Sequence, residues 1–208
     1  MKKIMTGNYD NCKTGNLVSI SGDKGKLALY EGNYMKGLAP KKSFWNIWHD
    51  NIGKISEEEN TRYYVKKYYE EVLSKYDPMQ LYNLLENETI LLCYESCEDF
   101  CHRHLPAFYL ELFLGIKTSE VRVNSRRQTY HVQPRPEYLK DMLEEAIKET
   151  YDMNGYNSLR AAYLYNIYKQ ILKEEEYEDT FNLDNEELAL QYRQEAEKEE
   201  KKYIMSMN

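Results

Sequence analysis

Apolar and polar positions along the chain predict short strands that alternate with amphipathic helices. Lys3–Thr6 and Leu17–Ile20 are short apolar runs that predict strands. Residues 57–75 carry apolar side chains at helical spacing and predict a long amphipathic helix. The continuous apolar run Thr89–Tyr94 is typical of a central strand that is buried on both faces.

Capping residues mark where several predicted helices begin and end. Ser43 predicts the start of one helix, and the pair Asp77–Pro78 predicts the start of another. A further helix covers residues 102–114 and ends at Gly115, and the short strand Glu120–Val123 follows it. This alternation predicts an α/β fold, specifically a Rossmann-like three-layer sandwich with a mostly parallel sheet.

The pattern changes after about residue 124. Ser125–Pro136 is polar, contains two prolines and predicts a linker. Three helical patterns follow, at residues 137–152, 158–176 and 185–203. We therefore divide the chain into an α/β core, residues 1–124, and a C-terminal α-helical extension, residues 125–208. We expect the extension to pack on the core or to form a homodimer.

Composition limits the classes of partner. The 208 residues are 42% hydrophobic and 13% aromatic, enough to bury a core, and the net charge is -7. Acids are concentrated in Leu172–Lys202, and such a surface repels phosphate backbones, so we expect no nucleic-acid partner. No apolar run reaches 18 residues and no apolar stretch follows the basic start, so we expect a cytoplasmic protein without a membrane span.

Candidate chemistry is concentrated in residues 93–104. Three of the four cysteines, two of the four histidines, an arginine and three acids lie there, between a predicted strand and a predicted helix. In open α/β sheets, ligands bind where strands end and helices begin. In a cytoplasmic chain, cysteines more often act as thiols, catalytic groups or metal ligands than as disulfides. We therefore expect the functional site in this segment.

The string LLCYESCEDFCHRHLPAFYLEL resembles the signature of the domain-of-unknown-function family 488. The upstream strings LVSISGDKGK and GLAPKKSFW are similar to the family's N-terminal strand and its Leu-Ala-Pro segment. The resemblance spans about residues 3–123 and implies a fold and a site rather than a reaction. The signature positions that it implies are Cys93, Glu95, Cys101, His102 and Arg103.

Each of these residue types suits a role in catalysis or binding. Arg103, near the first turn of a helix, is expected to bind an anion such as phosphate or carboxylate. His102 can act as a general acid or base, and Cys101 beside it can act as a nucleophile. Glu95 is expected to orient His102 or to bind a ribose hydroxyl. In the structural alternative, Cys93 and Cys101 only pack, and His102 and Arg103 tie the loop through Glu95.

Two other kinds of site fit this segment less well. Cys97 and Arg103 have the Cys-x5-Arg spacing of phosphatase loops, but Glu98 and Asp99 would repel a bound phosphate. Cys93, Cys97, Cys101 and His102 could supply four zinc ligands, but they lack a Cys-x2-Cys knuckle. Neighbours at 101 and 102 also rarely point at one ion. We therefore expect no metal and no cofactor.

Two further groups complete the expected picture. Thr6, Asn8 and Tyr9 follow the first strand and are expected to form a second wall of the cleft, although the glycine pattern there is not a dinucleotide fingerprint. Trp45 and Trp48 are expected to belong to the core rather than to a base-stacking platform.

The leading hypothesis is an enzyme that acts on a small anionic, nucleotide-like metabolite. One rival is a non-catalytic module that binds or sequesters such a ligand. The other is a structural or interaction protein that uses its acidic C-terminal helices. The sequence names neither the substrate nor the reaction.

Overall fold

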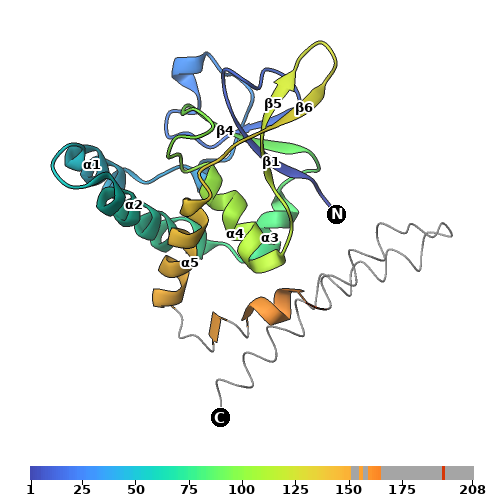
Figure 1. Ribbon diagram of the computed structural model, residues 1–208. Coiled ribbons are helices and arrows are strands. Elements are labelled where there is room, and N and C mark those ends of the chain that lie inside the picture. Colours follow the sequence, from blue (N-terminus) through green and yellow to red (C-terminus); the bar gives the residue numbers. More distant parts are fainter. Residues whose placement is uncertain (151–154, 157–158, 165–193, 195–208) are drawn as a thin grey trace.

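A computed structural model describes residues 1–150, 155–156, 159–164 and 194 (Figure 1). Residues 159–164 are helical and fall within the predicted helix 158–176. The remainder of that helix lies outside the described residues, as does the predicted helix 185–203 apart from Gln194, so the expected dimer stays a prediction.

The core is a six-stranded sheet whose strand order is β3-β2-β4-β1-β5-β6. Neighbouring strands are parallel except for β5 and β6, which are antiparallel. The strands are β1 (Ile4–Asn8), β2 (Asn16–Ser19), β3 (Asn33–Tyr34), β4 (Thr89–Cys93), β5 (Ser119–Asn124) and β6 (Thr129–Gln133). The predicted α/β sandwich with a mostly parallel sheet is confirmed.

Helices cover the two faces of the sheet unequally. The α-helices are α1 (Lys42–Asn51), α2 (Glu57–Glu71), α3 (Pro78–Leu84), α4 (His104–Leu114) and α5 (Tyr138–Thr150). All five contribute to one large apolar cluster on the same side of the strands (Figure 1). The opposite face is covered by the loop after β1 and by the short 3-10 helix η1 (Lys26–Ala28), with tyrosine rings filling the space.

Strand β4 lies between β2 and β1 and is buried on both faces, as its unbroken apolar run predicted. Leu91 packs in the cluster on the helical side, whereas Ile90 and Leu92 pack in the cluster on the other side. Successive side chains of a strand point to opposite faces, so a strand covered on both sides needs apolar residues throughout.

The helix ends agree with most of the predicted caps. Asp77 accepts a hydrogen bond from the Gln80 backbone at 3.0 Å, with Pro78 in the first turn of α3. Gly115 ends α4 with a left-handed φ of 64°. The prediction that Ser43 caps α1 is wrong, because α1 begins one residue earlier and the Ser43 hydroxyl donates instead to Glu71 at 2.6 Å.

The linker predicted at Ser125–Pro136 is wrong. Residues Thr129–Gln133 form strand β6, which pairs with β5 as a hairpin at the edge of the sheet. An edge strand with a polar, exposed face gives a weak apolar signal, and the prolines that follow it suggested a linker. The division of the chain at residue 124 falls at the start of this hairpin turn, and α5 packs against α2 and α4.

None of the helices in the described part of the chain is both long and apolar enough to cross a bilayer.

Candidate active site at the end of the central strand

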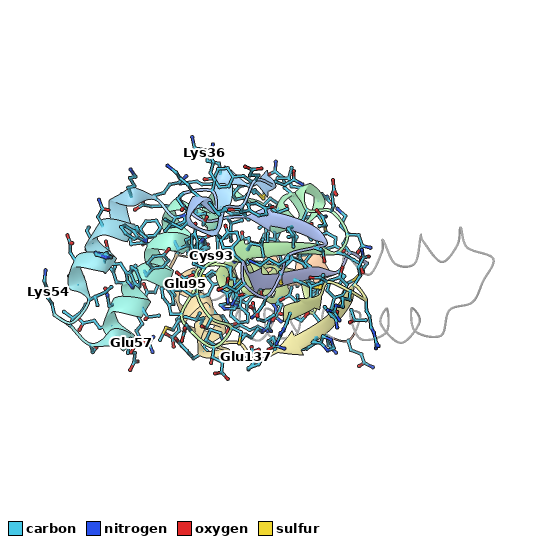
Figure 2. All side chains as sticks on the ribbon, turned by 90° about the horizontal axis from the view of Figure 1, so that it is seen from above. Lys36, Lys54, Glu57, Cys93, Glu95 and Glu137 are labelled. Carbon is cyan, nitrogen blue, oxygen red and sulfur yellow. The ribbon has the colours of Figure 1, made fainter. Side chains whose placement is uncertain are left out.

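The candidate site lies where β2 and β4 end side by side. Ser19 pairs with Leu92 in parallel register, and the Ile20 amide donates to the Leu92 carbonyl at 3.1 Å. The two strands therefore deliver their following loops to the same edge. A pocket of about 520 Å³ opens there, with Cys93, Glu95, Cys101 and His102 among its lining residues. Figure 2 shows Cys93 and Glu95 near the junction of the sheet with the α1–α2 helices.

Four of the predicted residues meet at the floor of this pocket. The Cys101 Sγ lies 2.7 Å from Glu95 Oε2. The His102 Nδ1 lies 3.7 Å from the Cys93 Sγ and 4.0 Å from the Cys101 Sγ. Cys93, Cys101 and His102 are all buried, so the protein excludes water from one side of the cluster. Four of the five signature positions, Cys93, Glu95, Cys101 and His102, therefore lie together in the structure.

The ring of His102 is fixed by a backbone carbonyl. Its Nε2 lies 2.9 Å from the Ile20 oxygen, an acceptor, so Nε2 carries the proton and donates. In the neutral ring Nδ1 is then an unprotonated acceptor that faces the two thiols. This orientation was predicted to come from Glu95, but Glu95 bonds to Cys101 instead.

The groups of the cluster shift one another's pKa. Burial alone would raise the pKa of Cys101, but the hydrogen bond from Cys93 and the positive charges of Arg103 and His102 outweigh it and hold the pKa well below its usual range. Burial alone would lower the pKa of His102, yet its hydrogen bond to Cys101 and the thiolate charge there raise it. Cys101 therefore favours the thiolate form.

Cys93 and Glu95 shift in the opposite sense to Cys101. The hydrogen bond to Cys101, together with burial, raises the pKa of Cys93 well above its usual range. Burial of the carboxylate and the charge of Cys101 raise the pKa of Glu95 to about 7. Cys93 is therefore a protonated neighbour, whereas Glu95 gains and loses a proton near neutral pH.

Arg103 does not line the pocket. Its side chain is fully buried and forms two hydrogen bonds to Glu120, from Nε at 3.2 Å and from Nη2 at 3.1 Å. The same Nη2 donates to the Ser96 carbonyl at 2.8 Å and so holds the loop that follows β4. The expected contact between Arg103 and an anion in the pocket is therefore corrected: the guanidinium is committed to a buried carboxylate. Its charge still acts on Cys101.

The partner of Arg103 was not found from the sequence. Glu120 lies on β5 and is 1% exposed, in register with Thr6 on β1. The sequence did place Glu120 directly beside Val121 in a predicted strand. A buried carboxylate needs a positively charged or hydrogen-bonding partner, and this requirement was the one indication that Arg103 could pair with it. The residue that neutralises Glu120 is Arg103, 17 residues earlier in the chain, and the order of the strands is needed to identify it.

Thr6, Asn8 and Tyr9 do not line the pocket, contrary to expectation. Thr6 is fully buried within β1. The Asn8 side chain accepts the Asn11 amide at 2.8 Å and stabilises the turn after β1. The Tyr9 hydroxyl bonds to the hydroxyls of Ser19 and Ser21, at 2.7 and 3.0 Å. Strand β1 therefore contributes no residue to the pocket lining, because β4 separates it from β2.

An aromatic wall of the pocket, from α1, α2 and the loop after β4, was missed. Trp45, Trp48, Tyr64 and Phe100 line the pocket. The Trp48 ring packs against those of Tyr64 and Phe100, with centroids 5.3 and 5.6 Å apart, so its predicted place beside the core is confirmed. Trp45 was also predicted as core, but it is 40% exposed. The structure buries Phe44 on α1. The helical spacing of Trp45 and Trp48 therefore did not identify the buried face of this helix.

Three of the four residues weighed as zinc ligands lie together in the structure. Among the described residues, Cys93, Cys101 and His102 bring their ligand atoms within 4.8 Å of one another. The expectation that neighbours 101 and 102 do not point at one place is therefore wrong. Cys97, the fourth cysteine of the sequence pattern, is not part of this group.

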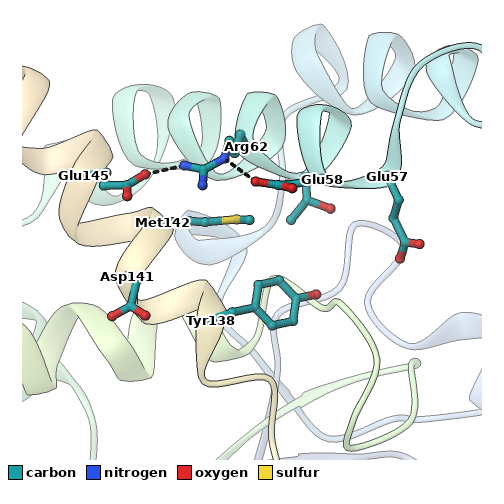
Figure 3. Close-up of a pocket in the computed structure, with 8 residues that line it drawn as sticks. Glu57, Glu58, Arg62, Tyr138, Asp141, Met142 and Glu145 are labelled. Atoms are coloured by element: carbon teal, nitrogen blue, oxygen red, sulfur yellow. Dashed lines mark hydrogen bonds and ion pairs between the residues drawn. The ribbon is translucent and has the colours of Figure 1, made fainter.

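A second pocket, of about 700 Å³, lies between α2 and α5 (Figure 3). Arg62 crosses it and pairs with both Glu58 and Glu145. Neither cysteine nor histidine is among the residues that line it. We therefore place the candidate chemistry in the pocket at the end of β4.

Comparison with known proteins adds one finding. No curated protein and no solved structure matches the chain. Residues 21–112 match a family model described as DUF488-N3a, active DUF488-N3 subclade. The matched segment contains β3, β4 and the whole Cys-x-Glu and Cys-His-Arg loop. Residues 21–112 thus match the domain-of-unknown-function family 488, the family that the signature resembles.

Proposed function

We propose that the protein binds a small nucleotide-like metabolite in the pocket at the end of β4 and transforms it by nucleophilic attack of Cys101. The observation that carries this proposal is the Cys101 Sγ, 2.7 Å from Glu95 Oε2 on the floor of a pocket of about 520 Å³. A pocket of this volume suits a ligand of nucleotide size. The description of the matched family as an active subclade agrees with turnover.

The proposed reaction is a two-step displacement at an electrophilic carbon. The Cys101 thiolate forms a carbon–sulfur bond while the bond to the leaving group breaks, and the Glu95 carboxyl donates its proton to that group. Water then attacks the same carbon, the Glu95 carboxylate takes a proton from the water, and the sulfur leaves as thiolate. His102 stabilises the thiolate in both steps. A Glu95 pKa of about 7 allows the carboxyl to serve as acid and then as base.

The pocket also offers groups that suit the parts of a nucleotide. The aromatic wall provides a surface on which a planar ring can stack. Lys42 lines the pocket at the first residue of α1, a helix without a side-chain cap. Its ammonium and the free backbone N–H groups there take the anionic part of the ligand, the role first expected of Arg103.

We further propose that the protein works in the cytoplasm, where a reducing environment keeps Cys93 and Cys101 as thiols. The C-terminal helices are proposed to join two copies, with neither nucleic acid nor membrane as a partner.

Alkylation by iodoacetamide, followed by mass spectrometry of the intact chain and its peptides, tests the nucleophile. Cys101 should be labelled first, and its rate should persist at pH values where an ordinary thiol, with a pKa of about 8.5, is protonated. Cys101→Ser should remove the fast label, and Cys97→Ser should leave it unchanged. A fast label on Cys97 alone, or a rate that follows an ordinary thiol pKa, would contradict the proposal.

Native mass spectrometry of protein purified from cells then tests the ligand. A released nucleotide-like compound should be consumed by the wild-type protein but only bound by Cys101→Ser. Equal binding by both proteins without consumption would favour the non-catalytic binding module instead.

A further inference from the structure

We propose that Cys93, Cys101 and His102 form a binding site for a soft divalent cation, Zn²⁺ in the first instance, on the floor of the pocket. This inference goes beyond the proposed function, because a bound cation would occupy the same sulfur that is proposed to attack the substrate. Bound zinc would therefore block the nucleophilic attack by Cys101.

The spacing of the three ligand atoms suits zinc. All three lie within 4.8 Å of one another, and the His102 Nδ1 lies 3.7 Å from the Cys93 Sγ and 4.0 Å from the Cys101 Sγ. With Zn–S near 2.3 Å and Zn–N near 2.0–2.1 Å, tetrahedral geometry places S and N about 3.6 Å apart. The two N···S distances therefore need to change by only a few tenths of an ångström, and the two sulfurs, within 4.8 Å of one another, need to approach to about 3.8 Å.

The histidine is already oriented as a ligand. Its Nε2 donates to the Ile20 carbonyl at 2.9 Å, which leaves the lone pair of Nδ1 directed towards the sulfurs. Metal-binding histidines almost always use their second nitrogen in this way, and the bond fixes both the tautomer and the ring orientation. Cys93 is the last residue of β4, and Cys101 and His102 lie in the turn directly before α4, so the three side chains lie close to the ends of two regular elements.

The ligand set and the surroundings define which ion fits. Two thiolates and an imidazole favour zinc over magnesium and calcium, which prefer oxygen. Cys93, Cys101 and His102 are 3%, 2% and 6% exposed, so the site faces solvent only through the pocket. The fourth position is left for Glu95, whose carboxylate already contacts Cys101, or for water.

Zinc binding to the full-length protein tests this site. The protein is freed of metal with a chelator, kept under a phosphine reductant and titrated with ZnCl₂ or MgCl₂, with native mass spectrometry and calorimetry as readouts. We expect one Zn²⁺ per chain and no Mg²⁺. Cys93→Ser should weaken Zn²⁺ binding by about 100-fold or more, since even the loss of an outer partner of a ligand costs about 10–100-fold.

Matched variants separate this inference from the proposed nucleophile. Cys97→Ser should bind Zn²⁺ as the wild type does, and His102→Gln should lose binding as Cys93→Ser does. Zn²⁺ should slow alkylation of Cys101 in the wild type at concentrations that leave Cys93→Ser reactive. The inference would be overturned if the wild type did not bind Zn²⁺, or if Cys93→Ser or His102→Gln bound it as tightly as the wild type does. The alkylation rate without metal tests the nucleophile independently.

Discussion

Replacement of Arg103 by methionine tests whether this signature residue stabilises the fold rather than contacting a ligand. Arg103 is 0% exposed and Glu120 is 1% exposed, and the guanidinium also holds the Ser96 carbonyl. The variant leaves the Glu120 carboxylate buried without its positively charged partner. Breaking a buried ion pair from one side costs about 3–5 kcal/mol of unfolding free energy, because the remaining charge loses its compensation.

Urea unfolding followed by circular dichroism measures this cost, and Arg62 provides the matched control. Arg62 also pairs with two carboxylates, those of Glu58 and Glu145 (Figure 3), but its side chain is 47% exposed. Arg62→Met should therefore cost much less than Arg103→Met, because solvent screens an exposed ion pair. The double variant Arg103→Met/Glu120→Leu should recover much of the loss, because it removes the unpaired charge.

A cost for Arg103→Met no larger than that for Arg62→Met would refute this reasoning and return Arg103 to the anion-binding role expected from the sequence. The same outcome would follow if Arg103→Met/Glu120→Leu were no more stable than Arg103→Met, because the unpaired carboxylate would then not be the source of the cost.

The remaining predictions concern a titrating group and the packing of α1. Burial raises the pKa of Glu95 from its ordinary 4.5 to about 7, so between these pH values the folded protein binds more protons than the unfolded chain. Stability should therefore fall as pH rises through this window, and Glu95→Gln should flatten the fall when thermal unfolding is followed at several pH values; an unchanged slope would contradict the shift. Phe44→Ala should cost about 3–5 kcal/mol because Phe44 is 1% exposed, whereas Ile47→Ala on the same helix, with Ile47 49% exposed, should cost about 1 kcal/mol or less. Urea unfolding that gives equal costs would show that the buried face of α1 is assigned wrongly.

Much of the fold could be predicted from the sequence because its determinants are local. The run Thr89–Tyr94 predicted β4 because an unbroken apolar strand needs cover on both faces. Asp77 and Gly115 predicted helix ends because capping is decided within one turn. Strand β6 was missed because an exposed edge strand carries little apolar signal.

The site was located by the sequence but not resolved by it. The clustering of Cys, His, Arg and Glu between a strand and a helix indicated where a pocket opens. The aromatic wall was not indicated, because α1 and α2 reach the pocket only through tertiary packing.

The sequence by itself determined the positions of most strands and helices, the position of the loop after β4 and the residue types available for chemistry there. Only the tertiary structure decided which atoms meet. Arg103 faces Glu120 rather than the pocket because β5 joins the sheet beside β1. His102 turns towards Cys93 and Cys101 because β2, parallel to β4, presents the Ile20 carbonyl to its other nitrogen. Apolar periodicity records which face of an element is buried, but the partner of a buried polar atom depends on which strand lies next to it.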